Sequence, residues 1–207
     1  MRKLNLISIA AVLACGLAER AFPQDKPAEK PAGATQGSPV PSSGARAEFL
    51  AEIEYYEQRY MRLAEAIPAD KYAWRPGEGV RSIGEVYAHI SAANYGVARA
   101  LGTQPPAGLD FKAITAAAAD KAKVARLLKE SFAHFRQAIL AISDADMDKP
   151  QKMFNRQTTV RGAFFMITGH FGEHLGQSIA YARVNGITPP WTEEAQQQQK
   201  AAEKPKP

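Results

Sequence analysis

The sequence predicts an all-α protein, a four-helix bundle with disordered ends. Between about residues 45 and 191, apolar side chains recur at steps of three and four residues in four separate segments, which is the period of an amphipathic helix. No segment alternates apolar and polar residues as a half-buried strand would. All 14 prolines and nine of the 15 glycines lie outside the four periodic segments. These three observations favour a single helical domain.

The first two helices have clear sequence boundaries. The first carries an apolar stripe from Phe49 to Ile67 and stops at Pro68. The second starts after Ser82, because Ser82 to Glu85 is a capping box, in which each side chain accepts from the other residue's backbone N–H. It runs to about Leu101, before a stretch rich in glycine and proline.

The third and fourth segments predict two further helices. The third begins near Thr115 and carries its apolar seam to Ile142. The fourth is capped by Thr158 or Thr159 and stops at Asn185-Gly186, where glycine readily takes the left-handed conformation. The residues between them form a polar connection that is long for a bundle.

The two ends of the chain have compositions that do not predict packing. Residues 1–18 are typical of an export signal, with Arg2-Lys3, a short apolar stretch and then small residues. The apolar stretch is too short to remain as a membrane span. Residues 19–44 are rich in Pro, Ala, Gly and Ser and predict a disordered linker. Residues 192–207, with four consecutive glutamines, predict a disordered tail.

Cys15 is the only cysteine, and it leaves two alternatives for the mature N-terminus. Val12-Leu13-Ala14-Cys15 resembles a bacterial lipobox, in which the cysteine is lipidated, although leucine is unusual at its second place. Alternatively, a signal peptidase cuts after Ala14 or Ala18. We expect an exported protein, either periplasmic or lipid-anchored, with no disulfide in its domain. Its only link to a membrane would be a lipid at Cys15.

The charge distribution argues against a nucleic-acid partner. The net charge is +5, but residues 47–192 carry 17 basic and 15 acidic side chains. A nucleic-acid surface requires a basic stripe with interleaved aromatics, and the sequence has none. We expect a small-molecule substrate or ligand of unknown identity. A homodimer remains an open alternative.

Three of the four histidines are candidate metal ligands. His170 and His174 are four residues apart, so they lie on one face of the fourth helix, a spacing that lets two imidazoles bind one ion. Such a pair also occurs in ordinary helix packing. His89 lies on the inward side of the second helix, and facing helices of a bundle commonly build metal sites. Three protein ligands leave a position for water or substrate, as in catalytic sites. His134 falls off its apolar seam and is expected at the flank.

Two further side chains are candidates to assist this site. Gln177 lies on the same row as His170, two turns on, and predicts a hydrogen bond either to a metal ligand or within the core. Glu85, one turn before His89, is a weak candidate for a general base. Its capping role already accounts for its presence.

The ordered set of motifs resembles the DinB-like, or YfiT-like, family of metal-dependent four-helix bundles. In that family a Trp-x-Pro loop and a serine cap precede a helix with one histidine, and the last helix carries His-Glu-x-His-His-Arg-Gly-Gln. Trp74-Arg75-Pro76, the Ser82 cap, His89 and residues 170–177 match in order and spacing. The resemblance covers nearly all of residues 45–191. It implies a divalent-metal site at the three histidines, with zinc or nickel as the ion.

The chain departs from the family pattern at positions that include Leu175, which replaces its arginine, and Glu173, which replaces a histidine. If that arginine holds an anionic substrate in relatives, this chain lacks that role. Relatives of known activity include transferases and isomerases that use a cytoplasmic thiol, which an exported protein would not meet. We therefore consider a metal-dependent hydrolase or transferase, and alternatively a non-catalytic periplasmic domain that binds a metal or small ligand. A solvent-reachable, polar pocket at the site would favour the enzyme. A site sealed from solvent would favour the binding domain.

Overall fold

A computed structural model describes residues 40–203 of the chain. The whole of the expected signal peptide with Cys15, most of the expected linker, and the last four residues of the expected tail lie outside this range. Within it, no helix is both long enough and apolar enough to cross a membrane. The described residues form six α-helices, two short 3₁₀ turns (Ala69–Lys71 and Asp144–Asp146) and one two-stranded sheet.

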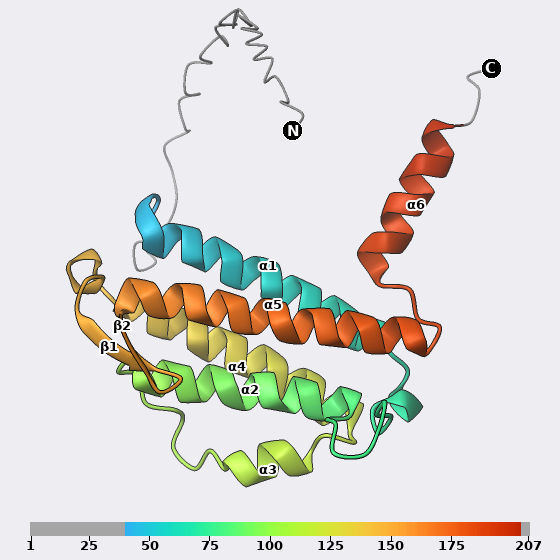
Figure 1. The fold of residues 1–207 in the computed structure, drawn as a ribbon, viewed down its shortest axis with the longest axis horizontal. Coiled ribbons are helices and arrows are strands. Elements are labelled where there is room, and N and C mark those ends of the chain that lie inside the picture. The colour runs from blue at the N-terminus through green and yellow to red at the C-terminus, as the bar shows by residue number, and fades with distance from the viewer. Residues whose placement is uncertain (1–39, 204–207) are drawn as a thin grey trace, which may run out of the picture. The chain divides into compact units, whose positions relative to one another are not determined.

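Four helices form the bundle: α1 (Gly44–Ala66), α2 (Ile83–Ala100), α4 (Lys121–Ala141) and α5 (Val160–Val184). Helices α1 and α2 each pack against both α4 and α5, which closes the bundle around one core (Figure 1). The all-α fold expected from the four apolar stripes is confirmed.

Aromatic side chains fill the centre of the bundle, beside the histidine-bearing part of α5. Tyr60, Phe132, Phe135 and Phe171 are fully buried and contact one another through their rings. The Tyr60 hydroxyl donates a hydrogen bond to the Phe171 carbonyl at 2.7 Å, which satisfies a polar group that would otherwise be costly to bury. This bond joins α1 to α5 one residue after His170.

The start of α2 is held by its cap and by a close approach to the neighbouring segment. The expected capping box is present: Ser82 Oγ accepts from the Glu85 N–H at 3.2 Å, and Glu85 Oε2 accepts from the Ser82 N–H at 2.7 Å. Gly84 then lies directly against the backbone at Ala118. A Cβ added to Gly84 would lie 1.7 Å from the Ala118 carbonyl oxygen, so only glycine fits. These contacts set the position of α2, and with it that of His89.

The third helix expected from near Thr115 is two helices in the structure, α3 (Phe111–Ala116) and α4. The Asp120 side chain accepts from the backbone N–H of Lys123 at 3.1 Å and so caps a new helix. Helix α3 packs against α2 through buried Ile114. The alanines at 116–119 favour helix, so the sequence predicted one continuous helix where the structure has two.

The polar connection expected before α5 contains a β-hairpin that the sequence analysis missed. Strand β1 (Pro150–Met153) pairs antiparallel with β2 (Arg156–Thr159), and Phe154-Asn155 joins them. Both joining residues have positive φ, 47° and 61°, as a type I′ turn requires. The hairpin packs against α5 and contacts α2 (Figure 1). The usual sequence signal for this turn is Asn-Gly or Asp-Gly. Phe154-Asn155 does not match that signal, so the sequence did not predict the turn.

The tail expected to be disordered over residues 192–207 is helical for most of its described part. Helix α6 (Pro190–Ala202) follows α5, and its first turn contacts α1. The Arg59 guanidinium lies 4.3 Å from the centre of the Trp191 ring, and Arg62 pairs with Glu194. From Glu193 onward the helix is exposed. Its glutamate, alanine and glutamine residues are good helix formers, which outweighs their low hydrophobicity.

Candidate metal centre

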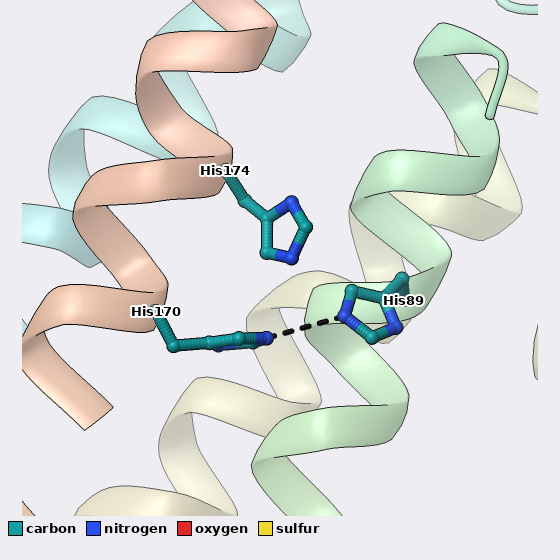
Figure 2. Close-up of side chains that lie close together, drawn as sticks. All are labelled: His89, His170 and His174. Carbon is teal, nitrogen blue, oxygen red and sulfur yellow. Dashed lines mark hydrogen bonds between the residues drawn. The ribbon is translucent and has the colours of Figure 1, made fainter. Parts of the chain in front are cut away.

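The structure brings His89, His170 and His174 together. His89 projects from α2 towards the two histidines of α5, as Figure 2 shows. One ring nitrogen from each lies within 4.8 Å of the others, and Nε2 of His89 is 3.2 Å from Nε2 of His170. His134 lies elsewhere, on α4, with its ring centre 5.1 Å from that of Tyr95. The helical spacing and the inward placement of His89 therefore predicted the right three side chains to converge.

The donor atoms of this cluster, and the one nitrogen–nitrogen distance between its helices, fit a divalent ion. Two nitrogen ligands bound at 2.0–2.1 Å with tetrahedral angles are about 3.3–3.4 Å apart. The 3.2 Å between the Nε2 atoms of His89 and His170 is close to that separation. Imidazole nitrogen suits zinc and nickel, whereas magnesium and calcium prefer oxygen. The residues present therefore suit the ion that the family resemblance implies.

Burial keeps two of the three imidazoles in the form that binds metal. Burial is the main cause that lowers the pKa of His89 from 6.5 to about 4; Arg81 and the other two histidines add to it, and Glu173 opposes it. Burial also lowers the pKa of His170 to about 4, with His174 and then Arg81 as the next causes. Both rings are therefore neutral at pH 7 and offer a lone pair without first losing a proton.

Gln177 fixes the orientation of the third imidazole. Its Oε1 lies 2.9 Å from Nδ1 of His174, and its Nε2 donates to the Tyr181 hydroxyl at 2.8 Å. Because an amide oxygen only accepts, Nδ1 of His174 carries the proton and Nε2 is left with a lone pair. Hydrogen bonds of this kind orient histidines in metal sites. Tyr181, four residues after Gln177 on the same helix, extends this hydrogen-bonded chain, and the sequence analysis did not identify it.

Glu85 is already engaged at the start of α2. One carboxylate oxygen accepts from the Ser82 N–H, and the other accepts from Arg75 at 3.0 Å. These contacts, the Ser82 backbone bond first, lower the pKa of Glu85. A carboxylate so held is a weak proton acceptor, which favours the capping role over the general-base role. Glu85 lines a surface hollow of about 390 Å³ together with Arg81 and His89.

A second hollow gives solvent access to the cluster. It has a volume of about 490 Å³ and is lined by α2, the hairpin and the half-buried His89 and His170. Besides the two histidines, its polar lining comes from Lys152 and Asn155, both on the hairpin. The sequence analysis did not find these residues, because only the tertiary position of the hairpin places them beside the histidines.

Comparison with known proteins decides the family. The family model of the DinB superfamily matches residues 52–178. The chain belongs to the DinB superfamily. This match confirms the resemblance expected from the motifs, and its range includes the three histidines and Gln177 of this DinB protein. No curated protein matches the sequence.

Two solved structures share the DinB fold with this chain. A DinB-like protein from Bacillus cereus ATCC 10987 superposes with a TM-score of 0.60 at 17% identity, covering 69% of this chain and 93% of that one. A DinB-like protein from Bacillus subtilis superposes with a TM-score of 0.54 at 18% identity, covering 68% and 93%. At these identities the likeness supports the fold of this DinB protein and no more.

Proposed function

We propose that this DinB protein binds one divalent ion, zinc or nickel, through His89, His170 and His174, and that it is a metal-dependent hydrolase or transferase. The observation that carries the proposal is a cluster of three convergent imidazoles that is open to solvent through a hollow with polar lining. A structural site would use a fourth protein ligand. No fourth His, Cys, Asp or Glu joins this cluster among residues 40–203.

The chain's own residues prepare the site for such an ion. Gln177 holds His174 with its Nε2 lone pair free, and burial keeps His89 and His170 neutral. When bound, a divalent ion with three nitrogen ligands supplies a Lewis acid with a vacant position. Lys152 and Asn155 line the way in, where they can bind and orient a small molecule.

A non-catalytic binding domain is the alternative, and one observation favours it. Glu85, the carboxylate considered for general-base catalysis, has both oxygens occupied by Ser82 and Arg75. Proton transfer would then require a group other than this carboxylate. Turnover of model esters, amides and thiol acceptors by the metal-loaded protein separates the two hypotheses.

Metal analysis of protein purified without a histidine tag tests the metal site. The wild type should hold one equivalent, and alanine at His89, His170 or His174 should remove it. His134→Ala is the matched control and should keep the ion, because His134 lies against Tyr95 on another helix. Metal should also raise the unfolding free energy, by about 2.7 kcal/mol at a free concentration of one hundred times Kd. A triple-alanine variant that still binds one equivalent would refute the site.

We also propose that the protein is exported, either free in the periplasm or anchored through a lipid on Cys15. The basic start, the short apolar stretch and the small residues after it support this. Labelling cells with a fatty-acid analogue distinguishes the two forms, since an anchored protein loses its label in Cys15→Ser. Recovery of the protein from the cytoplasm with Met1 intact by mass spectrometry would contradict export.

A further inference from the structure

The hollow beside the histidine cluster has two unlike walls. Besides His89 and Val97, the α2 wall has three small residues, Ala93, Gly96 and Ala100, whose spacing of three and four residues puts them on one helix face. A Cβ built on Gly96 would meet nothing within 4 Å, so this wall is set back. The opposite wall is the end of the hairpin, Lys152–Asn155. The volume of about 490 Å³ is within the range of small-molecule sites.

Phe154 at the hairpin tip combines an unfavourable backbone conformation with an exposed ring. Its φ of 47° is in the left-handed region, which glycine and asparagine tolerate and bulky residues disfavour. Its side chain is 47% exposed, so it gains little from burial. The ring centre lies 5.5 Å from that of His170, with the planes tilted by 31°. A disfavoured conformation held beside a cluster of ligating groups points to a role in binding.

The charge of this wall indicates the kind of molecule that would complement it. Lys152 lines the hollow and has no ion-pair partner among residues 40–203. Within the described part of the chain, no acidic side chain lines the hollow. A cation on one side of an aromatic ring, with apolar helix surface opposite, complements a flat apolar group that carries a negative charge.

We propose that Phe154 and Lys152 form the substrate-recognition wall of the site, for a small molecule that has a flat ring and an anionic group. The ring of the ligand stacks on Phe154 and its anion lies by Lys152, which leaves the rest of the molecule facing His89 and His170. This inference rests on the proposed function, since it assigns the substrate class of the same site. It does not require the metal for binding of the ring and the anion.

Binding of 2-naphthoate to the full chain tests the wall. Affinities are measured by calorimetry on chelator-treated protein, so that the carboxylate has no metal ion to bind. A parallel series uses zinc-loaded protein. Naphthoate should bind the chelator-treated protein at least about threefold more tightly than the neutral 2-naphthamide, which lacks the charge, and than acetate, which lacks the ring. Lys152→Gln should remove the preference over the amide. Equal affinity for all three probes would overturn the proposal.

Phe154→Gly separates a binding role from a packing role. It should weaken naphthoate binding about three- to tenfold by removing the stacked ring. The unfolding temperature should stay the same or rise, because glycine relaxes the left-handed turn. Phe165→Ala is the matched control: Phe165 is 75% exposed on α5 and lines a different hollow, against α1, so naphthoate affinity should not change. A fall in unfolding temperature without loss of affinity, or an equal loss in both variants, would overturn the proposal.

The two proposals can fail separately. If naphthoate behaves as expected but the histidine variants still hold metal, the metal site is wrong and the wall remains a ligand site. If the histidine variants lose metal but naphthoate affinity is the same in wild type and Phe154→Gly, the wall is wrong and the metal site remains. Zinc affinity of Phe154→Gly should match the wild type within about twofold, because the ring supplies no ligand.

Discussion

Replacement of Gln177 is the most direct test of whether the histidine cluster is built to hold a metal. Gln177→Met keeps the approximate length and volume of the side chain. It removes the oxygen that accepts from Nδ1 of His174 at 2.9 Å and the nitrogen that donates to Tyr181 at 2.8 Å. Without that acceptor, His174 can carry its proton on either ring nitrogen and rotate. A metal ion would then have to select one tautomer and one orientation.

The expected cost of this change has two parts. Loss of the partner of a metal-bound histidine typically lowers metal affinity 10- to 100-fold, or about 1.4–2.7 kcal/mol. Separately, His174 is only 7% exposed, so its unpaired Nδ1–H would lower the unfolding free energy of the metal-free protein by about 1–3 kcal/mol. Tyr181→Phe removes only the far end of the hydrogen-bonded chain and should reduce zinc affinity by less.

Competition for zinc against a chromophoric chelator at pH 7 measures the first part, and urea unfolding of the metal-free proteins measures the second. Gln177→Glu is the matched control, because it keeps an acceptor for Nδ1 of His174 and should retain zinc affinity. The reasoning is refuted if Gln177→Met binds zinc within twofold of the wild type while His174→Ala does not bind it. In that case the hydrogen bond between Gln177 and His174 stabilises the core and does not contribute to metal binding.

Two further predictions concern stability. Gly84→Ala should lower the unfolding free energy by about 3 kcal/mol or more, because its Cβ would overlap the Ala118 carbonyl. The control, Gly176→Ala, has no described atom within 4 Å of its Cβ and should be neutral or stabilising by up to about 1 kcal/mol. Equal urea midpoints for the two variants would contradict this. The metal-free protein should lose stability as pH falls from 6.5 towards 4, because unfolded histidines take up protons near 6.5 but His89 and His170 only near 4. Urea midpoints at pH 7, 5.5 and 4 check this, and a variant with glutamine at both positions should lose less.

The parts of the fold that the sequence predicted are those whose signals are local. The apolar stripes of α1, α2 and α5 repeat over many turns, so chance cannot easily produce them. The caps of α2 and α5 also depend on a few neighbouring residues: the Ser82 capping box and the Thr159 cap are both present in the structure. The same holds for His170 and His174, whose shared face follows from the geometry of one helix.

The parts that the sequence did not predict depend on competition between local preferences or on tertiary contacts. At residues 116–120, alanine favours a continuous helix, but the Asp120 cap and the packing of α3 on α2 divide it. In α6, helix propensity operates without an apolar stripe, so the periodic signal was absent. In the hairpin, Phe154 occupies a position where asparagine or glycine is usual, so a rule based on favoured residues excludes the turn.

The same division between local and tertiary structure separates the two tasks of the candidate site. The three histidines lie on helices whose positions are fixed by the Gly84 contact and by the Tyr60 bond to α5, so the geometry of the metal site depends on the bundle core. The recognition wall lies at the end of the hairpin, where the side chains of Lys152 and Phe154 are both exposed and lie outside the bundle core. Substitutions at the end of the hairpin can therefore change which molecules bind while metal affinity stays constant. Related DinB chains with the same histidines and different hairpin tips should accordingly differ in ligand preference more than in metal preference.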